Sequence, residues 1–217
     1  MSNRNYYYLI SSLPKLRLDD YKEHYRLDNY IADLKKHLTE EHLYFVQGIV
    51  QNKERGLSAA NADDIAQQQF YLKMTTSSNE FIRSYFTFDR DLRNVLVALN
   101  KRKFNLDTDG YVGEQEDDVI HNLKISSLSD FGLSWDLSYV PALIDHFQSD
   151  DIVSFERYVD QLRWETIDSI NTFKYFAIDV LLGYLVKFML VERWLSLDVQ
   201  SGDEIFKDRT KVSLATA

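Results

Sequence analysis

The chain has 217 residues, 45% of them hydrophobic, so it can bury a substantial core as one large domain or as two small lobes. It contains no cysteine, which excludes disulfides, thiolate metal sites and cysteine nucleophiles. Its 25 basic and 34 acidic residues give a formal net charge of −9, which argues against a nucleic-acid partner, and only 7 Gly and 2 Pro favour an all-α fold.

Helical periodicity extends over most of the first half of the chain. Residues 6–14 are ambiguous, because their three tyrosines and neighbouring apolar residues suit either a short strand or a buried helical turn. Apolar residues at three- and four-residue spacing predict helices over 19–36, 39–56 and 61–72. Ser77 and Glu80 have the spacing of a capping box, so a long helix is expected from Asn79 to Phe104.

Residues 105–118 are polar and acidic and include two glycines, which is typical of a connection between structural units. We therefore expect an N-terminal helical lobe over 1–104, an acidic linker loop over 105–118 and a C-terminal helical lobe over 119–217. Each lobe would be a bundle of antiparallel helices, because short connections make successive helices neighbours.

Part of this linker has the spacing of a twelve-residue calcium-binding loop. Oxygen ligands would come from Asn105, Asp107, Asp109 and Glu116, and Gly110 would supply the tight turn. An asparagine stands in the first position, where an aspartate is expected, and this removes a charge that would attract the cation. We therefore favour the alternative interpretation, a solvated acidic loop without a metal.

The C-terminal third carries the longest apolar pattern. Shorter helices are expected around it, over 117–125, 139–147 and 203–211. Residues 150–195 keep an apolar stripe without proline, interrupted at Thr166, which predicts one or two long helices. Residues 176–191 are apolar on nearly every side and must be surrounded by protein, while Asp179 and Lys187 argue against a membrane span.

The sequence contains no motif of an enzyme active site. A glycine-rich phosphate-binding loop, a nucleophile elbow and a secretory signal pattern are all absent. His37, Glu40, Glu41 and His42 lie close in sequence, but only His37 and Glu41 share a helix face, so we interpret the group as a solvated surface. We expect a cytoplasmic, non-catalytic protein without a cofactor.

Several stretches resemble a known family of helical proteins. Residues 89–102, DRDLRNVLVALNKR, have an acidic-x-x-Leu-x-Asn pattern that ends in a basic residue, and residues 182–194, LGYLVKFMLVERW, have a Gly-Tyr-Leu start followed by a glutamate. Both are similar to the stalk subunit of V-type and A-type ATPases, called C in archaeal and bacterial complexes and d in eukaryotic ones. The chain more closely resembles an uncharacterised bacterial branch that is regarded as subunit-C-like. This resemblance is carried by residues 6–14, 130–133 and 192–198, with Gly202 and Phe206.

The resemblance implies a non-catalytic adaptor. In the family, stacked helix bundles sit on the membrane rotor ring and receive the central axle, which supports ATP-coupled ion transport. This chain is shorter than the three-bundle form of the family, which implies two bundles with long helices. The implied partners are other V/A-type ATPase subunits, and the implied location is cytoplasmic, peripheral to the inner membrane through the complex and without nucleic acid.

Residues on the long helices are the candidates for partner contacts. We select Arg93, Glu192 and Trp194, whose alternative role is to lock the helical core; for Trp194 that alternative is favoured. Two other functions stay open. One is a metal- or ligand-dependent helical enzyme that uses the His37–His42 group or the 105–116 loop, and the other is a helical protein-interaction module unrelated to ATPases.

Overall fold

A computed structural model describes residues 6–18, 26–57, 64–106, 110–113, 117–149 and 151–196. These residues form nine α-helices and no strand, which confirms the predicted all-α fold. In chain order the helices are α1 (Tyr7–Ser11), α2 (Leu27–His37), α3 (Glu40–Leu57), α4 (Asp64–Thr75), α5 (Glu80–Phe104), α6 (Asp118–Ile125), α7 (Val140–Gln148), α8 (Ile152–Ile170) and α9 (Ile178–Ser196). Within the described ranges, no helix is both long and apolar enough to cross a membrane.

Most of the predicted helices are present, with ends displaced by a few residues. The opening residues 6–14, whose structure the sequence left open, contain the short helix α1. Parts of the predicted helices over 19–36 and 61–72 lie outside the described residues, as does the whole predicted helix over 203–211. The remaining predictions, apart from the long C-terminal stripe, correspond to one observed helix each.

The long helix α5 begins at a different cap from the one expected. Asn79 is the N-cap, and its side-chain oxygen accepts a hydrogen bond from the backbone N–H of Ile82 at 2.9 Å. The predicted capping box of Ser77 and Glu80 is therefore wrong. The carboxylate of Glu80 pairs instead with Lys174 Nζ at 2.9 Å, a contact that crosses to the turn before α9.

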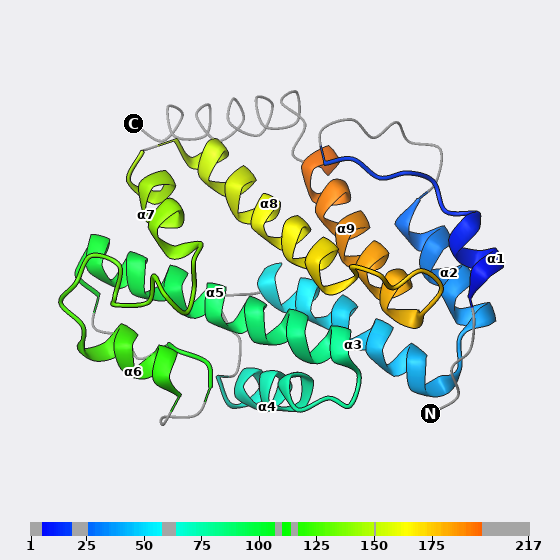
Figure 1. Cartoon of the computed structure of the whole chain (residues 1–217), viewed down its shortest axis with the longest axis horizontal. Coiled ribbons are helices and arrows are strands. Elements are labelled where there is room, and N and C mark those ends of the chain that lie inside the picture. The colour runs from blue at the N-terminus through cyan, green and yellow to red at the C-terminus, as the bar shows by residue number, and fades with distance from the viewer. Residues whose placement is uncertain are drawn as a thin grey trace, which may run out of the picture.

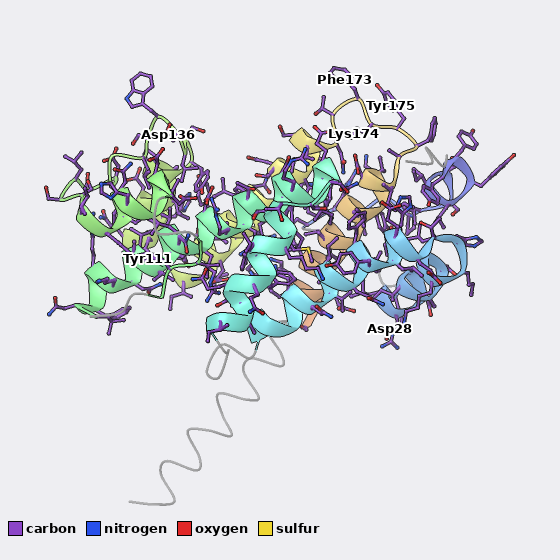
Figure 2. All side chains as sticks on the ribbon, turned by 90° about the horizontal axis from the view of Figure 1, so that it is seen from below. Asp28, Tyr111, Asp136, Phe173, Lys174 and Tyr175 are labelled. Atoms are coloured by element: carbon purple, nitrogen blue, oxygen red, sulfur yellow. The ribbon has the colours of Figure 1, made fainter. Side chains whose placement is uncertain are left out.

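The long C-terminal apolar stripe forms two helices, α8 and α9, but the break between them lies at 171–177. Two long helices are one of the two predicted outcomes, and Thr166, where the apolar spacing is interrupted, lies inside α8. Phe173 in the break has a left-handed backbone with φ of 64° and is 84% exposed. Figure 2 shows Phe173, Lys174 and Tyr175 on a turn that projects from the body of the protein.

The helices pack around two hydrophobic clusters. The first joins α2, α3, α4 and α9, and the second joins α6 and α7. Helices α5 and α8 contribute to both, with Phe86 and Ile167 in the first and Leu99 and Val159 in the second, and α5 extends along much of the molecule (Figure 1). Because α9 packs with helices from the start of the chain, the clusters group the helices differently from the predicted lobes over 1–104 and 119–217.

Helices α8 and α9 approach each other closely at Gly183, which is buried. A Cβ atom at this position would lie 2.8 Å from Cγ2 of Ile167 and would also clash with the side chain of Asn171. Larger residues at such a contact force the helices apart. The glycine of the Gly-Tyr-Leu stretch therefore permits the close packing of α8 and α9.

Candidate functional site

A groove of about 740 Å³ lies where α5 meets α3, α4, α8 and α9, and we call it the central groove. One part of its lining is apolar: Leu96, Val97, Val186, Met189 and Leu190. Another part is charged: Asp89, Arg93, Glu156, Arg163, Glu192 and Arg193. The central groove therefore combines apolar surface with acidic and basic groups, which makes it the candidate functional site.

Asp89 in α5 is a buried, hydrogen-bonded carboxylate of the central groove. It is 6% exposed and accepts hydrogen bonds from Tyr71 Oη at 2.8 Å and from Asn52 Nδ2 at 3.1 Å. The Nε atom of Arg163 lies 3.6 Å from its other oxygen. Burial, together with the neighbouring Asp89 carboxylate, raises the pKa of Tyr71 well above its ordinary value. Tyr71 therefore keeps its proton and donates it in the hydrogen bond to Asp89.

Asp160 in α8 is fully buried and forms the centre of a second charged cluster. It accepts hydrogen bonds from Arg163 Nη1 at 3.0 Å, from Arg193 Nη2 at 2.6 Å and from Trp194 Nε1 at 2.8 Å. Arg193 also pairs through Nη1 with Glu156 Oε2 at 3.0 Å. Because Arg193 and Trp194 belong to α9, these contacts join the end of α9 to α8.

Arg163 connects the two carboxylates, at 3.6 Å from Asp89 and 3.0 Å from Asp160. Burial alone would lower the pKa of Arg163, but the nearby carboxylates outweigh it and raise the pKa above its ordinary value. The guanidinium therefore stays charged between its two partners. Since Asp89 lies on α5 and Asp160 on α8, the linked clusters fix the positions of α5, α8 and α9.

Arg93 has different surroundings from the other arginines of the central groove. Its Nη2 atom donates to the neutral amide oxygen of Gln67 at 3.0 Å. Across the described ranges, no carboxylate lies within ion-pair distance of Arg93. Its Nε atom, like that of Arg193, is buried and has no hydrogen-bond partner. Arg93 therefore brings to the groove a positive charge that has no ion-pair partner among the described residues.

The structure brings the three predicted contact residues to one region. Arg93 and Glu192 both line the central groove, and Trp194 donates to Asp160 beside it. Trp194 is half-buried, and its indole helps to hold α9 against α8. This geometry fits the structural role favoured for Trp194, while the partner contacts of all three residues stay a prediction.

The described centre of the predicted linker is held against the helices. Asn94, fully buried in α5, donates to the carbonyl oxygen of Val112 and accepts from its backbone N–H, both at 2.8 Å. Gln68 in α4 donates to the carbonyl oxygen of Tyr111 at 2.9 Å and accepts from the N–H of Gly113 at 2.8 Å. These paired hydrogen bonds attach the segment to two helices at once.

The predicted calcium loop lies mostly beyond what the structure describes. Asn105 is the C-cap of α5 and has a left-handed backbone with φ of 50°. Asp107, Asp109 and Glu116 lie outside the described residues, so calcium binding by this loop stays a prediction. In the part of the chain that can be searched, no group of three or more His, Asp or Glu side chains could hold a metal ion.

The histidine group near the start of α3 does not converge on one point. His37 lies exposed in the last turn of α2, and Glu40 and Glu41 lie exposed in the first turn of α3. His42 is half-buried, with its Nδ1 atom 2.6 Å from the hydroxyl of Tyr6. The solvated-surface interpretation therefore fits His37 and both glutamates, whereas His42 belongs to a local contact with the N-terminal segment.

Asp160 and Arg163, the centre of the buried charges, were not among the predicted site residues. A sequence signal for them exists, because both lie between Val159 and Ile167 on the apolar stripe of α8. Charged residues at core positions are rarely buried unless they are paired. Such residues could have been identified as members of an internal ion-pair network, although their partners could not.

Comparison with known proteins identifies one family. A family model described as "Protein of unknown function (DUF2764)" matches residues 40–212 of the chain. The matched range includes α3 to α9, and therefore every helix that lines the central groove. No curated protein matches the chain. No solved structure matches it.

Proposed function

The chain belongs to the DUF2764 family, and we propose that it is a non-catalytic stalk or coupling subunit of a bacterial V/A-type ATPase. In this role it links the central axle to the membrane rotor ring and supports ATP-coupled ion transport. Its location is then cytoplasmic, peripheral to the inner membrane through the complex. The proposal rests on the resemblance of residues 89–102 and 182–194 to the stalk subunit and on the way these residues are braced.

The observation that carries the proposal is the internal bracing of the long helices. Helices α5, α8 and α9 have 25, 19 and 19 residues and pack against one another. Asp89, Asp160 and Arg163 join them through buried charge pairs. A part that transmits torque needs long elements whose relative positions do not shift. A buried network of ion pairs and hydrogen bonds resists such shifts, and this supports a stiff connector.

The charged groups of the central groove also suit a structural and contact role. The oxygens of Asp89 and Asp160 accept hydrogen bonds from neighbouring side chains of the same chain. A general base needs an acceptor that can reach the substrate proton, and these carboxylates are occupied by their own partners. Arg93 and Glu192 also line the groove, on α5 and α9, and they are the candidates for partner contacts.

The test is co-purification of the full chain with the ATPase. An affinity-tagged chain, recovered from its host under mild cross-linking, should bring down head, axle and rotor-ring subunits. Replacement of Arg93 and Glu192 together by alanine should reduce this recovery if both contribute to contacts. Exposed Asp136 is a matched control, and Asp136→Ala should leave recovery unchanged. Recovery of no ATPase subunit with the unaltered chain would contradict the proposed function.

The size of the central groove favours one alternative, a ligand-dependent helical enzyme. Its volume of about 740 Å³ lies in the range of roughly 300–1,000 Å³ that small-molecule sites occupy. Metal analysis and native mass spectrometry of the purified chain discriminate between the two functions. A metal ion or small molecule bound in stoichiometric amount would favour the enzyme, whereas recovery of ATPase subunits with an empty chain would favour the stalk subunit.

A further inference from the structure

We propose that the central groove binds an amphipathic helix of a partner protein, and that a carboxylate in the apolar face of this helix pairs with Arg93. The proposal rests on the proposed function only in taking the partner to be a protein, and it adds the chemistry of the contact. Three features carry it: the length of the groove, the spacing of its apolar lining and the positive charge of Arg93.

The groove is long in the direction of two helices. Its lining residues run from Tyr85 to Asn100 on α5 and from Val186 to Ser196 on α9. With a rise of about 1.5 Å per residue, the two runs cover about 22 Å and about 15 Å, so the shorter one has roughly three helical turns. This length matches a partner helix of about ten residues that lies along the groove.

The apolar lining has the periodicity that a helix needs. Val186, Met189 and Leu190 follow three- and four-residue spacing on α9 and are buried at the floor of the groove, and Leu96 and Val97 lie on α5. Side chains with this spacing form ridges, and the side chains of another helix pack between such ridges. Leu96 and Val97 are half-buried, so they keep apolar surface that a partner can cover.

Arg93 determines the charge that the partner must bring. Arg163 and Arg193 pair with carboxylates of this chain and are neutralised internally. Arg93 donates to the neutral amide of Gln67 and, among the residues with described positions, has no carboxylate within ion-pair distance. A partly buried positive charge without a counter-charge is unfavourable, and a partner carboxylate removes this cost.

The overall charge of the chain adds a second requirement. The net charge of −9 repels an acidic partner and attracts a basic one over longer distances. A helix satisfies both conditions when its exposed face is basic and its apolar face holds one carboxylate. The long-range field then governs the approach of the helix, and Arg93 fixes its register in the groove.

The experiment uses the full chain and two stapled helical peptides of about 15 residues. Both peptides carry leucines at three- and four-residue spacing and lysines on the opposite face. One has a glutamate within the leucine stripe, and the other has a glutamine at that position. Titration calorimetry should show about 10-fold tighter binding of the glutamate peptide. Hydrogen–deuterium exchange should slow in the parts of α5 and α9 that line the groove.

Variants of the chain assign this preference to one residue. Arg93→Gln should give the two peptides equal affinity, and Leu96→Asp should weaken both. Arg83 is exposed on the same helix, so Arg83→Gln should keep the preference for the glutamate peptide. Failure of both peptides to bind, equal affinities for the unaltered chain, or a preference that persists in Arg93→Gln would each overturn the proposal. These outcomes are independent of ATPase co-purification, so the two proposals fail separately.

Discussion

Arg193 and Arg93 both line the central groove, but among the described residues only Arg193 has a carboxylate within ion-pair distance. Arg193 donates to the buried carboxylate of Asp160 at 2.6 Å and pairs with Glu156 at 3.0 Å. Arg93 donates to the neutral amide of Gln67 at 3.0 Å. Breaking a buried pair leaves a charge without its partner, whereas removing Arg93 leaves only the neutral amide oxygen of Gln67 without its donor. The two arginines should therefore differ in what they contribute to stability and to binding.

Asp160→Ala is expected to cause the largest loss of stability. The substitution leaves Arg163, Arg193 and the indole N–H of Trp194 without their shared acceptor. Breaking a buried ion pair in this way costs about 3–5 kcal/mol, which urea unfolding followed by circular dichroism can measure. Asp136, on an exposed loop in Figure 2, is the control, and Asp136→Ala should stay within about 0.5 kcal/mol. Equal effects would show that the Asp160 cluster does not stabilise the fold.

Asn94→Ala extends the comparison to a buried neutral group. The substitution leaves the backbone N–H and carbonyl of Val112 without their partner in a buried position, which costs about 2–3 kcal/mol. Asn100 lies exposed on the same helix, so Asn100→Ala should change the unfolding free energy by less than about 0.5 kcal/mol. Amide exchange at Val112 should also accelerate in Asn94→Ala. Unchanged exchange would mean that other contacts hold this segment in place.

Local signals in the sequence were sufficient for much of the fold. The helix expected over 117–125 is α6, which begins after Asp117, and the carboxylate of Asp117 accepts from the N–H groups of Val119 and Ile120. Here the cap and the apolar periodicity agree, so the start of the helix could be predicted. The all-α fold followed in the same way from composition and spacing.

The break between α8 and α9 could not be predicted from local signals. Residues 171–177 contain no glycine or proline, and apolar spacing continues through them. Contacts with other parts of the structure hold the turn instead. Asn171 Nδ2 donates to the carbonyl oxygen of Asp179 at 3.1 Å, and Lys174 pairs with Glu80 and Asp179, both at 2.9 Å. A pattern of apolar residues carries no information about such distant partners.

Only part of the candidate site could be predicted, because some of its residues depend on contacts between helices that are distant in sequence. Arg93 and Glu192 were selected because of the resemblance and because they lie on long helices, and the structure places both in one groove. The importance of Asp160 depends on Arg193, which lies 33 residues later in the chain and reaches it only after α9 has packed against α8. The sequence could indicate a buried charge on α8, but the partner that neutralises it is a product of the fold.

Arg93→Gln and Arg193→Gln test the opening comparison directly. Arg193→Gln removes contacts with two carboxylates, and we expect a loss of about 1–3 kcal/mol in unfolding free energy. Arg93→Gln breaks no ion pair among the described residues and removes one hydrogen bond to a neutral amide, so its effect should be below about 1 kcal/mol. Urea unfolding of the two variants under identical conditions provides the measurement. A larger loss for Arg93→Gln would show that Arg93 stabilises the fold.

Asp91 shows that pairing does not always offset burial. It is 7% exposed and 2.7 Å from Arg90 Nη2, yet burial raises the pKa of Asp91, and Arg90 offsets only part of this. The folded chain then holds the proton more tightly than the unfolded chain, whose aspartate pKa is about 3.9. The contribution of Asp91 to stability therefore falls as pH rises from about 4 through the folded-state pKa. As pH rises across this interval, the unfolding free energy of the unaltered chain should fall relative to that of Asp91→Asn. A pH-independent difference between Asp91→Asn and the unaltered chain would mean that Arg90 compensates the burial of Asp91 completely.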